Sequence, residues 1–233
     1  VPMVICFHGM NVNGSESAVR YGWYKVAEER GFIAVCPTGS QQATSFPTNF
    51  MWNYATDVPF VNALIDQMIE RYPVDATRVY ATGSSNGSMM AMWLQAAMPE
   101  RIAATASYDM VMALNSVPVV NENLKIALLA ISGSSDPSFG SKLETGTPTD
   151  SYKAMEAYLV NRLSLNDPLN YRNGNYDFYY YHTDAGVPLF VFENCIGRSH
   201  ADMPEDCYVC YDYMAKFSRG ADGTLFYMGQ EVK

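Results

Sequence analysis

Residues 78–87 read Arg78-Val-Tyr-Ala-Thr-Gly-Ser-Ser-Asn-Gly87 and run directly into the apolar stretch Ser88-Met-Met-Ala-Met-Trp-Leu. The first part predicts a strand ending near Thr82, and the second predicts a helix. Between them lies the pattern G-x-S-x-G, with Ser85 at its centre. A tight turn from strand to helix lifts such a serine above the sheet, at the positive end of the helix dipole. The stretch therefore predicts that Ser85 is a nucleophile. Ser84 is the neighbouring candidate, but it lacks flanking glycines. The alternative for Ser85 itself is a plain turn in which it caps the helix.

Strands and helices alternate on both sides of this turn. Continuous apolar runs predict strands over residues 2–8, 31–37, 102–107 and 125–132, and apolar periodicity or capping predicts helices over residues 15–30, 57–72, 149–163 and 205–218. Residues 176–182 and 187–193 predict a hairpin. Apolar strands that alternate with helices favour a doubly wound, mostly parallel α/β sheet with helices on both faces. We expect residues 1–233 to form a single catalytic domain.

Composition excludes several classes of protein. The chain has 233 residues, 48% hydrophobic and 17% charged, which excludes a disordered chain. No apolar stretch is long enough to cross a membrane. The net charge of −9 argues against nucleic acid as a partner, because an acidic surface repels phosphates. These features predict a globular protein whose partner is neither nucleic acid nor membrane.

Five cysteines give no metal site. Cys6 and Cys36 lie in apolar runs predicted to be strands. Cys207 and Cys210 have the C-x-x-C spacing, but no second pair completes a zinc site, so we interpret them as structural. A disulfide between Cys195 and either of them stays open. We predict no metal.

Only three histidines can serve as the base that Ser85 needs. His8 belongs to the first loop, and His182 lies within a predicted strand. His200 follows a late strand in a loop, from which an imidazole can reach over the strand end that carries Ser85, so we predict His200 as the base.

The base needs a carboxylate that orients its other ring nitrogen. Asp136 follows the apolar strand that ends at Ser132, and it is the predicted acid. Asp109 is its rival, and Asp150 is better explained as a residue at a helix start. Ser85, Asp136 and His200 then follow the chain order of α/β hydrolases.

Two backbone N–H groups are expected to form an oxyanion hole. One belongs to Asn86, directly after the nucleophile. The other belongs to Met10, where Gly9 allows the backbone to approach a substrate closely. His8 is expected to stabilise this loop. We assign His8, Gly9 and Trp52 to the substrate-binding surroundings.

Several stretches resemble the poly(3-hydroxybutyrate) depolymerase and feruloyl esterase group of α/β hydrolases: Val4-Ile-Cys-Phe-His-Gly9, Trp52-Asn53, Arg71-Tyr-Pro-Val-Asp75 and the residues 78–87 quoted above. The resemblance is strong over about residues 1–110 and looser afterwards. It implies an α/β-hydrolase fold. That fold normally begins with two strands before the first one here, and their absence from this sequence is a departure from the group. The resemblance also implies a carboxylic ester hydrolase with Ser85, Asp136 and His200 as its triad and no cofactor. The loop Cys195-Ile-Gly-Arg-Ser departs from the glycine-rich sequence usual in this group.

The resemblance implies ester substrates of plant cell walls or short polyesters. The aromatic loop over residues 39–53, with Phe46, Phe50 and Trp52, suits a phenolic acyl group. We therefore expect a secreted feruloyl esterase that acts on small or polysaccharide-linked esters, with acetylxylan esterase or polyhydroxybutyrate depolymerase as alternatives. A serine peptidase and a non-catalytic binding module on the same fold are rivals from other classes.

Overall fold

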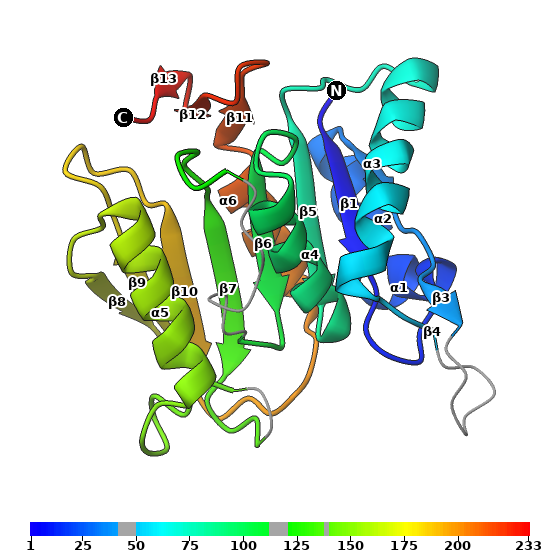
Figure 1. Cartoon of the computed structure of the whole chain (residues 1–233). Coiled ribbons are helices and arrows are strands. Elements are labelled where there is room, and N and C mark those ends of the chain that lie inside the picture. The colour runs from blue at the N-terminus through cyan, green and yellow to red at the C-terminus, as the bar shows by residue number, and fades with distance from the viewer. Residues whose placement is uncertain (42–49, 112–120, 138–139) are drawn as a thin grey trace.

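A twisted eight-stranded sheet forms the centre of the computed structural model, which describes residues 1–41, 50–111, 121–137 and 140–233 (Figure 1). In spatial order its strands are β2 (Ile33–Val35), β1 (Met3–Phe7), β5 (Val79–Ser84), β6 (Ala104–Tyr108), β7 (Leu128–Gly133), β10 (Phe190–Cys195), β9 (Tyr176–Tyr181) and β8 (Leu169–Asn173). The neighbouring pairs from β2 to β10 are parallel, and the pairs β10–β9 and β9–β8 are antiparallel. The predicted mostly parallel sheet is confirmed.

Helices cover both faces of the sheet. In Figure 1, α3 (Tyr54–Arg71), α4 (Asn86–Ala97) and α5 (Asp150–Leu163) lie in front, and α2 (Trp23–Arg30) and α6 (Pro204–Met214) lie behind. Successive residues of β1 pack on opposite sides: Ile5 shares a core cluster with Ile65 of α3, and Cys6 shares one with Trp23 of α2. A strand buried on both faces explains the continuous apolar runs in the sequence.

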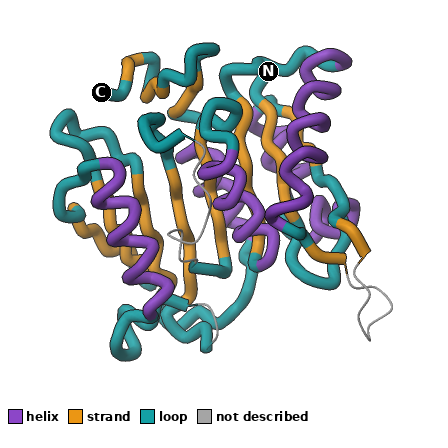
Figure 2. Tube along the Cα trace, in the orientation of Figure 1, coloured by secondary structure: helices purple, strands orange, loops and turns teal. Residues whose placement is uncertain are grey.

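The loops that leave the carboxyl ends of the parallel strands gather at the lower end of the sheet in Figure 2. Ligands of open α/β sheets bind at this end of the strands. Residues predicted to act together therefore come from loops that meet at one edge.

The prediction of one helix over residues 15–30 is wrong, because the structure has two helices there. The first, α1 (Gly14–Arg20), ends at Tyr21, and α2 begins after Gly22. Gly22 has a φ of 84°, a left-handed conformation that glycine adopts without strain and that no helix interior allows. Gly22 therefore separates the two helices.

The carboxyl-terminal part also differs from expectation. The last helix ends at Met214, and a small sheet follows, made of β11 (Phe217–Arg219), β12 (Leu225–Tyr227) and β13 (Gln230–Glu231). The sequence did not predict β8 either. All five residues of β8 are exposed, so this edge strand has no continuous apolar run of the kind that marks the buried strands.

At the opposite edge of the sheet, β2 pairs only with β1 in the described part of the chain. Among the described residues, no strand pairs with the outer side of β2, the edge next to which the resemblance places two further strands. In the aromatic loop, β3 (Ser40–Gln41) pairs with β4 (Phe50–Met51), while Phe46 lies outside the described residues.

All five cysteines are free, so the disulfide left open by the sequence does not form. Cys207 and Cys210 are buried on α6, where desolvation raises the pKa of both thiols well above the ordinary value. They pack as small apolar side chains. No helix in the described ranges combines the length and the apolar composition that crossing a bilayer requires.

Candidate active site

Ser85 occupies the turn between β5 and α4 with a backbone that few residues adopt, φ 52° and ψ −114°. The two glycines of the motif make this turn possible. A Cβ on Gly87 would lie 2.1 Å from the carbonyl oxygen of Phe7, and one on Gly83 would lie 2.4 Å from the backbone of Gly87. Both approaches are too close for any side chain, so strand and helix meet here only through glycine. The strand–turn–helix context that the sequence predicted is confirmed.

His200 connects Ser85 to Asp136. Its Nε2 lies 3.0 Å from Ser85 Oγ, and its Nδ1 lies 2.7 Å from Asp136 Oδ2. Asp136 is 1% exposed and the imidazole is 37% exposed, so the carboxylate is shielded while the base stays open to the cleft. The structure thus joins the three predicted residues in one hydrogen-bond chain, in the arrangement that transfers a serine proton to an imidazole.

The rival residues do not take part in this hydrogen-bond chain. Asp109 contacts Ser84 instead of an imidazole, with Ser84 Oγ 3.3 Å from Asp109 Oδ2. His182 is half-buried and its Nδ1 contacts the backbone carbonyl of Thr183. Asp150 is the first residue of α5.

The loop that carries Asp136 and the loop that carries His200 are joined by backbone hydrogen bonds. Ser134 N–H donates to the Cys195 carbonyl, and Ser135 N–H donates to the Arg198 carbonyl, each over 3.0 Å. A Cβ on Gly133 would lie 2.2 Å from the Arg198 carbonyl oxygen, so the two loops are in direct backbone contact. This contact sets the distance between Asp136 and His200.

An ion pair that sequence analysis missed fixes the histidine loop from the other side. Arg198 Nη1 donates to both carboxylate oxygens of Asp206, at 3.0 Å to Oδ1 and 2.8 Å to Oδ2. The side chains are 10% and 2% exposed, so this pair is shielded from water. Arg198 also stacks over the Tyr176 ring. The pair replaces the glycine-rich loop expected from the resemblance with a side-chain anchor. One sequence alone carries no signal for it.

The two residues predicted to supply the oxyanion donors are both close to the nucleophile in the structure. Met10 lines the same cavity as Ser85, and Asn86 begins α4. No hydrogen bond within the described residues uses the backbone N–H of Met10 or Asn86. Two N–H groups beside a serine hydroxyl are what a tetrahedral oxyanion requires.

His8 and Trp52 are fully shielded and do not contact this cavity, which corrects their assignment to substrate binding. His8 is 0% exposed and Trp52 is 3% exposed. His8 accepts the Gly39 N–H at 2.9 Å through Nε2, and Trp52 Nε1 donates to the His8 carbonyl at 3.0 Å. Burial lowers the pKa of His8. Both side chains hold the first loop through these hydrogen bonds, as the sequence indicated for His8. Of the three residues assigned to substrate binding, Gly9 alone lines the cavity.

The cavity beside Ser85 has a volume of about 350 Å³. Apolar side chains from the first loop, Met10 and Val12, form part of its wall. The other part is polar and includes Tyr21, Asp109 and Asp202. Nowhere in the described ranges do three His, Cys, Asp or Glu side chains gather as metal ligands would.

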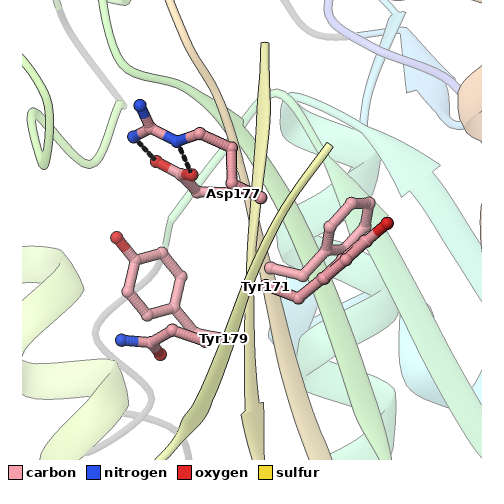
Figure 3. Close-up of a pocket in the computed structure, with 6 residues that line it drawn as sticks. Tyr171, Asp177 and Tyr179 are labelled. Atoms are coloured by element: carbon pink, nitrogen blue, oxygen red, sulfur yellow. Dashed lines mark hydrogen bonds and ion pairs between the residues drawn. The ribbon is translucent and has the colours of Figure 1, made fainter. Parts of the chain in front are cut away.

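A second cavity, of about 290 Å³, lies on the β8–β9 hairpin (Figure 3). Arg172 Nη2 lies 2.6 Å from Asp177 Oδ2 there. Figure 3 shows Tyr171 on one side of the two strands, and Asp177 and Tyr179 on the other. Neither Ser85 nor His200 lines this cavity, so the hairpin is separate from the reacting groups.

Comparison with solved structures identifies the fold. The chain matches an acetyl xylan esterase from Aspergillus awamori over 92% of its own length and 88% of the other chain, with a TM-score of 0.67 and 16% identity. The chain has the α/β-hydrolase fold. A carboxylesterase from Bacillus cereus shares this fold over 92% of this chain and 88% of the other chain, with a TM-score of 0.60 and 13% identity. The fold class predicted from the sequence is confirmed.

Curated relatives of this chain include esterases. It is 29% identical over 105 residues to a bifunctional acetylxylan esterase/xylanase of Neocallimastix patriciarum, 24% over 111 residues to feruloyl esterase B of Talaromyces funiculosus, and 33% over 96 residues to acetylxylan esterase A of Emericella nidulans. These matches cover 45%, 46% and 40% of this chain, but only 15%, 31% and 31% of the relatives. No family model matches the chain.

Proposed function

We propose that this chain is a serine carboxylic ester hydrolase that works through an acyl-enzyme, with residues 1–233 acting as a single catalytic domain. The observation that carries the proposal is the hydrogen-bond chain from Ser85 Oγ through His200 to Asp136, with distances of 3.0 and 2.7 Å. The α/β-hydrolase fold and the esterase relatives support it.

In the first half-reaction, His200 Nε2 takes the proton of Ser85 as Oγ attacks the ester carbonyl carbon. Asp136 holds the Nδ1–H and stabilises the imidazolium that forms. The tetrahedral intermediate collapses, the bond to the leaving oxygen breaks, and the imidazolium gives its proton to the departing alcohol. In the second half-reaction, water attacks the acyl-enzyme while His200 takes its proton, and Ser85 recovers a proton as the acid leaves.

The negative charge of each tetrahedral intermediate rests on the N–H groups of Met10 and Asn86. Each donor of this kind contributes about 2.7–4 kcal/mol to transition-state stabilisation. The strained backbone of Ser85 supports this role, since it places Oγ over the start of α4, where the helix dipole favours an anion.

The substrate class follows from the relatives. Their names include feruloyl and acetylxylan esterases. We propose a hydroxycinnamoyl ester, free or attached to a polysaccharide, as the preferred substrate, with acetylxylan and short polyhydroxybutyrate as alternatives. Such polymers lie outside the cell that digests them, so the proposal includes secretion.

The test combines a covalent probe with a substrate panel. A fluorophosphonate should label the protein once, at Ser85, and the Ser85→Ala variant should lose both labelling and hydrolysis. Ser218→Ala, on the distant strand β11, is the matched control and should keep both. Absence of labelling would instead support a non-catalytic binding module.

The panel should contain methyl ferulate, acetylated xylan, hydroxybutyrate oligomers, and a matched peptide ester and amide. Fastest hydrolysis of methyl ferulate is the expected result. Preference for the peptide amide would overturn the ester assignment in favour of a serine peptidase.

A further inference from the structure

Two carboxyl groups meet next to the nucleophile, and the hydrolytic mechanism uses neither of them. Ser84 Oγ lies 3.3 Å from Asp109 Oδ2 and also contacts Asp202 Oδ1. Both acids line the cavity that contains Ser85 and His200. Asp109 ends the turn after β6, and Asp202 follows His200 by two residues. The pair therefore forms a wall of the reaction cleft.

The surroundings of Asp109 keep its carboxyl group protonated. The Ser84 hydroxyl has a single proton, which can satisfy only one of two facing carboxylates. Burial, together with hydrogen bonding to Asp202 and its charge, raises the pKa of Asp109 to about 9, so Asp109 is the protonated member at neutral pH. Arg20 Nη2 lies 3.3 Å from Asp202 Oδ2 and forms an ion pair with it.

The pair is not fully satisfied by the protein. Asp109 is 2% exposed, yet its Oδ1 has no hydrogen-bond partner among the described residues. Its backbone is also left-handed, with a φ of 64°, which is rare outside glycine and gathers at functional sites. The Asp202 side chain is 12% exposed and offers an anionic acceptor to the cavity. A buried polar atom without a hydrogen-bond partner destabilises the protein unless a ligand supplies that partner.

We propose that the Asp109–Asp202 pair receives a hydroxyl group of the ester substrate, with Asp202 as the acceptor and Asp109, Ser84 and Arg20 holding it in place. The inference rests on the proposed esterase function and specifies its substrate: an ester that carries a free hydroxyl near the scissile bond. A cavity of about 350 Å³ accommodates one ring that bears such a group. A substituent with a carboxylate is rejected by the same charge.

The hydroxyl can come from two parts of an ester, and two substrate pairs distinguish them. Methyl 4-hydroxycinnamate against methyl cinnamate tests a phenolic hydroxyl on the acyl side. A monoacetylated xylopyranoside against cyclohexyl acetate tests a sugar hydroxyl on the alcohol side. In one of these two substrate pairs, kcat/KM should favour the hydroxylated ester by about tenfold or more. This is the effect expected of one hydrogen bond to a charged group.

Variants then assign the effect to the acidic pair. Asp202→Ala should reduce the preference in that pair to about twofold or less, mainly through KM, and Asp202→Asn, which keeps an acceptor oxygen, should restore part of it. Asp212→Ala removes the acid of another Arg–Asp pair, Arg30–Asp212 at 3.2 Å, away from the cavity. This matched control should keep the full preference.

The wild-type ratios alone can overturn the inference, whether or not a variant folds. Hydrolysis of both members of both pairs at equal kcat/KM would refute it while leaving the esterase proposal intact. A preference that survives in labelled, folded Asp202→Ala would also refute it. Absence of fluorophosphonate labelling and of all hydrolysis would instead refute the proposed function itself.

Discussion

His200 Nδ1 and Asp136 Oδ2 lie 2.7 Å apart, although 64 positions separate the two residues in the chain. Backbone hydrogen bonds between their two loops and the buried Arg198–Asp206 pair hold them at this distance. The geometry of the candidate site therefore depends on contacts outside the three reacting residues.

Asp136→Asn should lower kcat by about 10³–10⁴-fold with little change in KM, because an amide cannot hold the imidazole in its productive tautomer or stabilise the imidazolium. Steady-state kinetics on methyl ferulate measure this effect. Asp150→Asn, at the exposed start of α5, is the control and should retain wild-type kinetics. An Asp136→Asn enzyme within tenfold of wild type would remove Asp136 from the proposed triad.

Arg198→Met should destabilise the protein by roughly 3–5 kcal/mol, because it leaves Asp206 buried without its partner. Chemical denaturation measures the loss. In the surviving folded fraction kcat should also fall, since the loop that positions His200 loses its anchor. Arg30→Met breaks the exposed pair with Asp212 and should cost no more than about 1 kcal/mol. Equal losses in the two variants would show that the buried pair has no special role.

Gly87→Ala should destabilise the fold by roughly 1–3 kcal/mol or more and abolish hydrolysis, because the new Cβ would meet the Phe7 carbonyl oxygen at 2.1 Å. Thermal unfolding and esterase assays report the two effects. Gly146→Ala is the matched control, since a Cβ there meets nothing within 4 Å. Tolerance of alanine at position 87 would contradict the close approach of α4 to β1.

Glu193 should make stability depend on pH. It is 2% exposed, and burial, with the nearby charge of Asp206, raises its pKa to about 7, from an ordinary value of 4.5. The folded state then binds more protons than the unfolded state between pH 4.5 and 7, so the free energy of unfolding should fall as pH rises through this window, by on the order of 3 kcal/mol.

Denaturation of wild type and Glu193→Gln across pH 4.5–8 checks this expectation. The variant should lose most of that slope, because an amide does not titrate. Glu122→Gln, at an exposed position, should keep the wild-type slope. A wild-type slope that persists in Glu193→Gln would assign the pH dependence to other groups.

The nucleophile turn could be predicted because its determinants are neighbours in the chain. An apolar strand, two small residues around Ser85 and an apolar helix follow one another within residues 78–98. Asp136 and His200 were found by a different argument: each follows an apolar strand, and parallel strands end at one edge of the sheet. Both arguments use backbone regularities that a pattern of residues expresses directly.

The sequence by itself determined the alternation of buried strands and helices, and with it the sheet edge where Ser85, Asp136 and His200 meet. Only the tertiary structure decided that Arg198 anchors to Asp206, that Asp109 faces Asp202 across Ser84, and that His8 and Trp52 are covered. Secondary structure follows from the periodic burial of neighbouring residues. Contacts between loops depend on how separate segments pack, and no local pattern in one chain encodes the partner of a given side chain.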